Sequence, residues 1–116
     1  EKRADRNNYV KKMEHILLEN ISNSDFVLKD LIESMEYSSP YCFKLFKKET
    51  GKSPMQYLID LRIKDSLNLM KISNLNIKEI SRHVGFSDAY YFSRLFHKKM
   101  KMSPSKYRKE NIYSVY

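Results

Sequence analysis

The 116-residue sequence has little glycine, proline or cysteine, and it has no tryptophan. Two glycines and three prolines leave long stretches without a residue that interrupts helices, so we expect a mostly helical chain. The single cysteine, Cys42, excludes a disulfide framework and a zinc site of several thiolates. Because its neighbours Phe43 and Leu45 are apolar, we expect Cys42 to be a small buried side chain.

The sequence also lacks the patterns of a membrane protein, an enzyme or a metal site. It has no apolar run of transmembrane length and no signal peptide, which favours a cytoplasmic protein. His15, His83 and His97 do not have the spacing of metal ligands, and no glycine-rich loop is present to cradle phosphates. We therefore expect no catalytic activity, no cofactor and no metal.

Positive charge is the most prominent feature that is present. The chain has 22 Lys and Arg against 14 Asp and Glu, a formal net charge of +8 and a pI near 9.5. On a small domain such an excess favours an anionic partner, either nucleic acid or an acidic membrane surface. The alternative is a soluble protein whose lysines are merely solvated. A hydrophobic content of 41% is enough for a packed core.

One stretch of the sequence occurs twice. LFKKETGKSPMQY at 45–57 returns 50 residues later as LFHKKMKMSPSKY at 95–107. An internal repeat indicates that one supersecondary unit was built twice. Both copies carry their cationic residues in the same places, which predicts a partner with a periodic negative surface.

Hydrophobic periodicity predicts helices and no strands. The predicted helices span 9–21, 28–35, 39–50, 54–72, 77–84, 88–99 and 104–110, and residues 1–8 are featureless. Ser38, Ser53 and Ser103 are expected N-caps, each with a proline nearby in the first turn, and Gly51 is an expected left-handed C-cap. The predicted organisation is an N-terminal tail and helix (1–26), a first helix-turn-helix unit (27–53), a linker helix (54–72), a second unit (73–110) and a frayed tail (111–116).

In a helix-turn-helix the second helix enters the DNA major groove, so it needs one apolar face and one free polar face. The residues expected to face DNA in the first unit are Ser39, Pro40, Phe43, Lys44, Lys47 and Lys48. In the second unit they are Ser87, Asp88, Ala89, Tyr90, Ser93, Arg94, His97 and Lys98. Arg94 is suited to guanine or to a phosphate. Phe43 either contacts a thymine methyl or packs into the adjacent helix.

The segments IKEIS (77–81), GFSD (85–88), YFSRLF (91–96) and SPSKYR (103–108) resemble the signature of AraC/XylS-type transcription regulators. Residues 45–51 and 57–62 are similar to the family's first half, and the resemblance covers roughly 27–108. It implies an all-α domain of about seven helices, with two helix-turn-helix subdomains joined by a long linker helix. Each subdomain would place its second helix in the major groove of one DNA site.

The resemblance also implies partners that this chain does not contain. Family members usually carry a separate sensor or receiver domain, and an activator of this type would contact RNA polymerase. We expect the isolated domain to be monomeric, without a membrane partner.

The length of the linker helix allows one chain to contact two grooves. A linker helix of about 18 residues rises roughly 27 Å, and successive major-groove faces lie roughly 34 Å apart. One chain would therefore reach two adjacent grooves, with some bending of the DNA.

Five positions depart from the family pattern. Ile32 and Ser81 stand where the family prefers alanine, at the close approach of the two helices, and the bulkier Ile32 is expected to open the first unit slightly. Lys101 replaces the usual glycine after the second recognition helix; a left-handed backbone there costs about 1 kcal/mol, and its side chain offers another cation. Ile59 and Leu67 are apolar where the family is often polar, and they would meet the N-terminal helix, a second subunit or a missing domain.

Two alternatives to sequence-specific binding stay open at this point. One is a non-specific architectural DNA binder, and the other is a helical protein-interaction module that uses the face of Ile59, Ile63 and Leu67. The two sets of residues expected to face DNA differ in sequence, since Phe43 stands in the first unit where Ser93 stands in the second. A protein that contacts only the DNA backbone does not need that difference, so the sequence favours specific binding.

Overall fold

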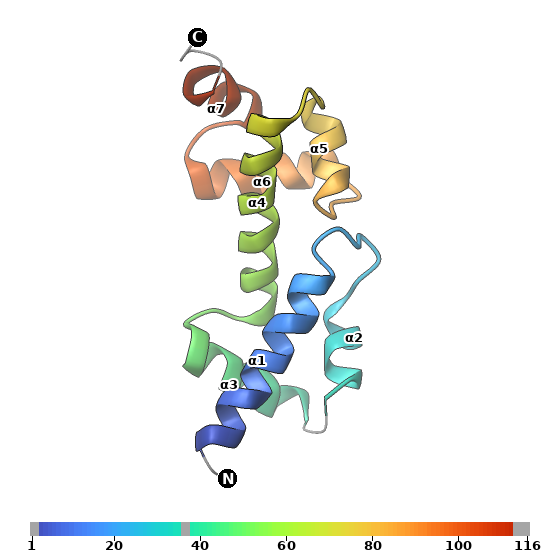
Figure 1. Cartoon of the computed structure of the whole chain (residues 1–116), viewed down its shortest axis with the longest axis vertical. Coiled ribbons are helices and arrows are strands. Elements are labelled where there is room, and N and C mark those ends of the chain that lie inside the picture. Colours follow the sequence, from blue (N-terminus) through green and yellow to red (C-terminus); the bar gives the residue numbers. More distant parts are fainter. Residues whose placement is uncertain (1–2, 36–37, 113–116) are drawn as a thin grey trace. The chain divides into compact units, whose positions relative to one another are not determined.

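The computed structural model describes residues 3–35 and 38–112, and all regular secondary structure in this part of the chain is helical (Figure 1). The helices are α1 (Arg3–Glu19), α2 (Leu28–Glu33), α3 (Ser39–Thr50), α4 (Pro54–Ile72), α5 (Ile77–His83), α6 (Ala89–Met100) and α7 (Pro104–Asn111). The predicted all-α fold of about seven helices is confirmed. None of the described helices combines the length and the apolar character that crossing a bilayer requires.

Local sequence signals determine where most helices begin and end. At the start of α4, Ser53 Oγ accepts a hydrogen bond from the Gln56 N–H at 3.2 Å, and Gln56 Oε1 accepts one from the Ser53 N–H at 3.0 Å. Asn76 and Glu79 make the same reciprocal pair at the start of α5. Such a capping box satisfies backbone donors that the first helical turn leaves unpaired. Helix α3 ends at Gly51, whose φ of 80° is the predicted left-handed C-cap.

Helix α6 ends at a lysine in the left-handed region. Lys101 has a φ of 66°, and its N–H donates to the His97 carbonyl at 2.8 Å. Among the described residues, no other non-glycine residue has a positive φ. A left-handed backbone is strained in an L-residue because its Cβ approaches the following carbonyl oxygen. This strain is expected from the sequence, because lysine stands where the family usually has glycine.

Helices α3 and α4 have the predicted bounds, and the other helices differ from the prediction at one or both ends. Helix α1 ends at Glu19 and not at Ile21, α5 ends at His83 and not at Val84, and α6 spans Ala89–Met100 and not 88–99. Helix α1 begins at Arg3, not at Tyr9, because arginine and alanine favour helix and α1 packs against α3. Helix α2 ends at Glu33, and Met35, predicted within it, is buried just beyond the end. Helix α7 includes Asn111, which the sequence placed in the tail, and 113–116 lie outside the described residues.

The chain divides into two compact units. Unit 1 comprises residues 1–21 and 25–61, and unit 2 comprises 22–24 and 62–116. Helix α4 contributes its first part to unit 1 and the rest to unit 2. The core of unit 1 combines apolar side chains of α1, α2, α3 and α4 with two from the segments that flank α2, namely Val10, Met13, Leu17, Phe26, Leu31, Met35, Cys42, Leu45, Phe46 and Leu58. Cys42 is fully buried, as predicted.

Unit 2 is built around aromatic rings that meet in tilted or edge-on contacts. Phe92 lies 5.2 Å from Phe86 and 5.7 Å from Phe96, and Phe96 lies 5.6 Å from Tyr107, measured between ring centroids. Aromatic pairs at these separations add to the free energy gained by burying the rings. These contacts hold α6 and α7 together and turn one side of α6 into the core.

Two buried arginines fasten the loops of unit 2. Arg62 Nη2 donates to the Asn23 carbonyl at 3.0 Å, and its guanidinium lies over the Phe86 ring at 5.6 Å. Burial lowers the pKa of the Arg62 guanidinium. Arg108 donates to the carbonyls of Ser73 and Leu75, in the segment that precedes α5. Both side chains therefore donate to backbone carbonyls in segments outside the helices, where the carbonyls have no hydrogen bond within a helix.

Candidate nucleic-acid interface

In unit 2, α5, a short turn and α6 form a helix-turn-helix. The turn is fixed by Gly85, which has a φ of 93°, and by the Phe86 N–H, which donates to the Ser81 carbonyl at 2.9 Å. Ser81 is fully buried, and its small side chain lets α5 pack against α6. The Asp88 carboxylate accepts a hydrogen bond from the Tyr90 N–H at 2.9 Å and so caps α6. The start of the second helix is thus fixed by its own sequence.

Helix α6 separates its residues into a buried face and an exposed one. Phe92 and Phe96 are fully buried, whereas 85% of the Tyr90 surface is exposed. The predicted DNA-facing residues that are exposed in this unit are Ser87, Asp88, Tyr90, Arg94, His97 and Lys98, and those that are half-buried are Ala89 and Ser93. The structure therefore brings the predicted set together on one side of α6 and its cap.

Tyr91 belongs to this surface, although it is not among the residues that the sequence predicted to face DNA. Its side chain is 40% exposed, and its ring lies 5.5 Å from the guanidinium carbon of Arg94. The same ring also makes an edge-on contact with the Phe86 ring, at 6.0 Å between centroids. A cation over an aromatic ring is held by electrostatic attraction, so Tyr91 limits where the Arg94 side chain points. The signal in the sequence was the spacing of three residues, which places both side chains on one helix face.

In unit 1, α3 has the corresponding division. Cys42, Leu45 and Phe46 are buried. The predicted DNA-facing residues that are exposed are Pro40, Lys44, Lys47 and Lys48. Phe43 is half-buried, which is compatible with both roles that the sequence allowed. The side chain of Ser39 lies outside the described part of the structure.

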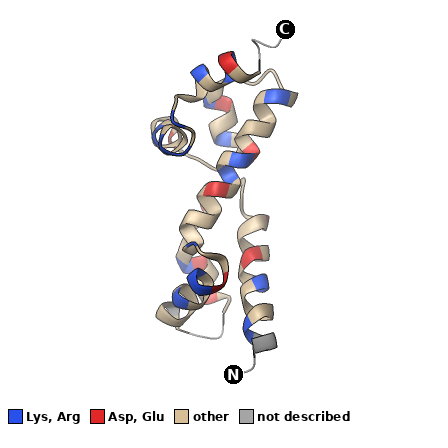
Figure 2. Cartoon of the chain, turned by 90° about the vertical axis from the view of Figure 1, so that its left-hand side faces the viewer, with Lys and Arg blue, Asp and Glu red and all other residues tan. Residues whose placement is uncertain are grey.

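The cations of these two faces are not neutralised within the described residues. No described carboxylate lies within ion-pair distance of Lys44, Lys47 or Lys48, and the same holds for Arg94. By contrast, Lys52, another basic residue of unit 1, pairs with Asp60. Lys and Arg occur on the helices of both units (Figure 2). Unpaired cations on an exposed helix face are the electrostatic pattern of a phosphate-binding surface.

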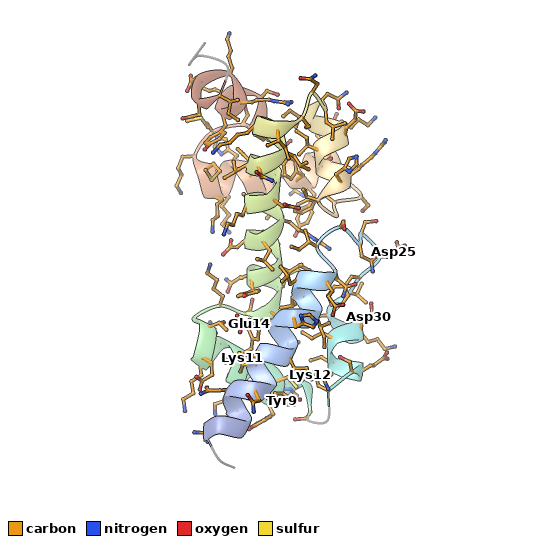
Figure 3. All side chains as sticks on the ribbon, viewed as in Figure 1. Tyr9, Lys11, Lys12, Glu14, Asp25 and Asp30 are labelled. Atoms are coloured by element: carbon orange, nitrogen blue, oxygen red, sulfur yellow. The ribbon has the colours of Figure 1, made fainter. Side chains whose placement is uncertain are left out.

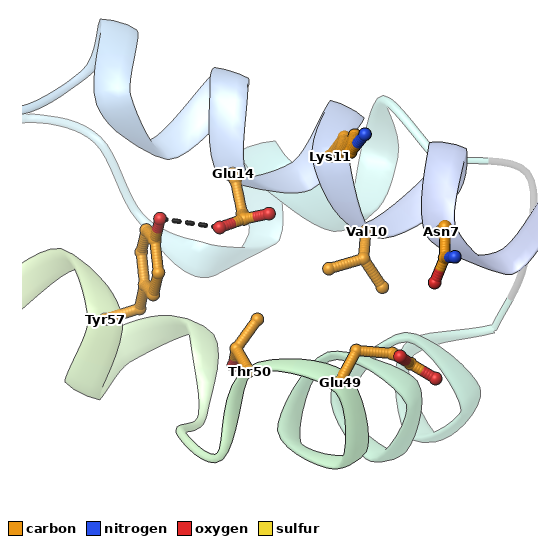
Figure 4. A pocket seen from close by; sticks show the side chains of 7 residues that line it. All are labelled: Asn7, Val10, Lys11, Glu14, Glu49, Thr50 and Tyr57. Atoms are coloured by element: carbon orange, nitrogen blue, oxygen red, sulfur yellow. Dashed lines mark hydrogen bonds between the residues drawn. The ribbon is translucent and has the colours of Figure 1, made fainter.

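A cavity of about 300 Å³ lies elsewhere in unit 1, and it has a different character. It is lined by Asn7, Val10, Lys11, Glu14, Glu49, Thr50 and Tyr57 (Figure 4). The Tyr57 hydroxyl donates to Glu14 Oε2 at 2.7 Å, and this hydrogen bond, with burial and the charge of Glu14, raises the pKa of Tyr57 to about 12. The hydrogen bond joins α4 to α1.

No cluster of three or more His, Cys, Asp or Glu that could hold a metal occurs in residues 3–35 and 38–112.

Comparison with known proteins gives consistent results. A family described as a helix-turn-helix domain matches residues 31–110. The Msm operon regulatory protein of Streptococcus mutans is 38% identical over 103 residues, which cover 89% of this chain and 36% of that protein. The chain spans between 20% and 36% of the length of the first three curated relatives it matches.

Solved structures share the fold. The C-terminal domain of AraT, a response regulator from Geobacillus stearothermophilus, superposes with a TM-score of 0.85 at 30% identity, covering 90% of this chain and 86% of that one. The DNA-binding domain of AdpA, a global transcriptional factor solved with a target DNA, has a TM-score of 0.81 at 23% identity, covering 87% and 90%. At that identity the second likeness concerns the fold alone.

Proposed function

This chain belongs to the AraC-type family of helix-turn-helix transcription regulators, and from that membership we propose that it is the sequence-specific DNA-binding part of a bacterial regulator. It binds double-stranded DNA, with α3 and α6 as recognition helices in adjacent major grooves. The helix-turn-helix domain that matches this chain is a DNA-binding domain of transcription regulators, in agreement with the expectation that the chain is not an enzyme.

The observation that carries the proposal is the two-sided helix α6. Its buried face is held by the rings of Phe92 and Phe96, while Tyr90 and Arg94 stay exposed on the side that the core does not use. A recognition helix must satisfy both conditions, because it has to be anchored in its own unit and still present side chains to base edges. The cap at Asp88 adds rigidity at the end of the helix that enters the groove first.

Each exposed side chain suits a particular part of DNA. Arg94 presents a guanidinium that can bind guanine O6 and N7 together, and Tyr90 offers an apolar ring edge to a thymine methyl. Lys98 and His97, further along α6, suit backbone phosphates. On α3 the equivalent surface consists of Lys44, Lys47 and Lys48 with the half-buried Phe43. The difference between the two faces favours recognition of a non-palindromic sequence over backbone binding alone.

For the whole protein we propose a sensor or receiver domain in addition to this one. The curated relatives are several times longer than the match, and AraT is named as a response regulator. The protein acts in the cytoplasm, where bacterial DNA lies, and as an activator it contacts RNA polymerase. The isolated domain is monomeric, since one chain carries two recognition helices. Sedimentation of the DNA-free domain tests this point: a stable dimer contradicts it and favours the protein-interaction alternative.

Selection of bound sites from random DNA tests the main proposal. The selected site and a scrambled site of equal length are then compared by equilibrium binding at one fixed, physiological salt concentration. We expect the selected site to bind at least about 10³-fold more tightly, with two preferred blocks about one helical turn apart. A ratio near one contradicts specific recognition and leaves the architectural alternative. A single block contradicts the engagement of both helices.

A further inference from the structure

A second cavity of unit 1 has an unusual charge. It has a volume of about 260 Å³ and is lined by Arg6, Tyr41, Lys44, Leu45 and Lys48. Three of these five side chains are cations, and the other two supply an aromatic and an aliphatic wall. No acidic side chain lines it, whereas the cavity of Figure 4 has Glu14 and Glu49 beside its single lysine. The two cavities are therefore electrostatically different, and only this one is suited to an anion.

The cations converge because of helix spacing and packing. Tyr41, Lys44, Leu45 and Lys48 stand at intervals of three and four residues along α3, so they share one face. Arg6 comes from α1, which packs against α3. Because α1 begins at Arg3, its first turns reach this face. Arg6 lies outside the segment 31–110 that matches the family.

The donors in the cavity match the chemistry of a phosphate. A guanidinium offers planar paired donors to phosphate oxygens, and each lysine adds a compact positive charge. An anion that binds in this cavity is attracted by all three cations at once, which favours a phosphate over a neutral ligand. We propose that this cavity binds a backbone phosphate of DNA, and that Arg6 is a DNA contact supplied from outside the helix-turn-helix.

DNA is the favoured source of the phosphate because of Lys44. That residue lines the cavity and also belongs to the exposed face of α3 that is proposed to enter the groove. Phosphates flank every groove, so an anion held beside Lys44 and Lys48 lies where the backbone next to α3 would run. The inference rests on the proposed function, and it extends the DNA-binding surface of unit 1 from α3 to α1.

The test compares two variants that each remove one positive charge from α1. Arg6→Ala empties one side of the cavity, and Lys12→Ala is the matched control, since Lys12 is exposed on α1 and lines neither cavity (Figure 3). The measurement is the slope of log K against log salt concentration on the selected site. We expect Arg6→Ala to reduce the magnitude of the slope by about 0.9, as for one lost phosphate contact, and Lys12→Ala to leave it unchanged.

Sequence dependence gives a second expectation from the same experiment. Arg6→Ala should weaken binding by the same factor on selected and scrambled DNA, because a phosphate contact does not read bases. Arg6→Lys keeps the charge and should recover most of the slope. Circular dichroism during heating shows whether α1 stays folded in each variant. Equal slopes for Arg6→Ala and the folded wild type overturn the proposal.

Titration of the DNA-free domain with inorganic phosphate separates the two possible sources. Saturable NMR shifts of the amides from Tyr41 to Lys48 that disappear in Arg6→Ala, with an unchanged DNA slope, would assign the cavity to a free phosphorylated ligand and overturn the DNA assignment. If phosphate causes no NMR shifts and Arg6→Ala leaves the salt slope of DNA binding unchanged, the cavity binds no phosphate. If the wild type does not prefer the selected site, the proposed function fails, yet the slope difference between Arg6→Ala and Lys12→Ala still tests the cavity.

Discussion

Replacement of Lys101 by glycine is expected to stabilise the protein and to weaken DNA binding. The lysine has a φ of 66°, and its side chain is exposed, so the substitution removes left-handed strain without opening a cavity. That strain is about 1–2 kcal/mol for an L-residue, and glycine also enlarges the conformational freedom of the unfolded chain by about 0.5–1 kcal/mol. The net gain in the free energy of unfolding is therefore about 0.5–1 kcal/mol.

The gain can be measured as a rise of a few degrees in Tm, about 2–5 °C for a chain of this size. Lys101→Ala is the matched control, because it removes the same charge but keeps the Cβ that causes the strain. A Lys101→Ala variant as stable as Lys101→Gly refutes the reasoning, since backbone strain is then not the cause. Both variants should lose about the same DNA affinity at low salt, if the lysine charge faces a phosphate.

Three further predictions concern the recognition surface and the junction of α4 with α1. Arg94→Ala should weaken binding to the selected site by about 1–3 kcal/mol and relax base preference at one position, in equilibrium binding to single-base variants of the site. Equal weakening on every sequence would make Arg94 a phosphate contact. Tyr91→Leu should lower the same base preference part of the way, while Tyr91→Phe, which keeps the ring near Arg94, should retain it; identical behaviour of both variants contradicts the positioning role. The pKa of Tyr57 is raised from 10.0 to about 12, so its hydrogen bond to Glu14 stabilises the fold fully below pH 10, and this contribution is lost as the pH rises through 12. Urea unfolding of wild type and Tyr57→Phe at pH 9 and pH 11 measures this, and the two should differ less at the higher pH; a constant difference rejects the assignment.

Helix boundaries were predictable where they depend on hydrogen bonds or backbone preferences of residues close together in the sequence. Ser53 and Gln56 fix the start of α4 through two hydrogen bonds between neighbours, and Gly51 ends α3 because it adopts a positive φ readily. These effects depend on a few adjacent residues. The sequence contains all the information that they need, and the bounds of α3 and α4 agree with the prediction.

The features that the sequence missed depend on residues far apart in the chain. The first turns of α1 have no apolar stripe, and they are helical where α1 packs against α3, so Arg6 was read as part of a featureless tail. Tyr91 was not among the predicted DNA-facing residues, yet of the neighbours Tyr91 and Phe92 only Phe92 enters the core. The DNA-facing residues of α3 and α6 stay predictions that a binding measurement tests, because the exposure of a side chain does not identify its partner.

The hydrogen bond between Arg62 and the Asn23 carbonyl has a consequence for the design of chimeric regulators. Residues 22–24 belong to unit 2, although the chain on either side of them belongs to unit 1. A graft that transfers only residues 62–116, to a scaffold without a carbonyl at the place of Asn23, leaves a buried guanidinium without this acceptor, which is destabilising. An exchange of DNA specificity between such proteins therefore needs two segments of sequence, and a fusion with one crossover point breaks the module it is meant to move.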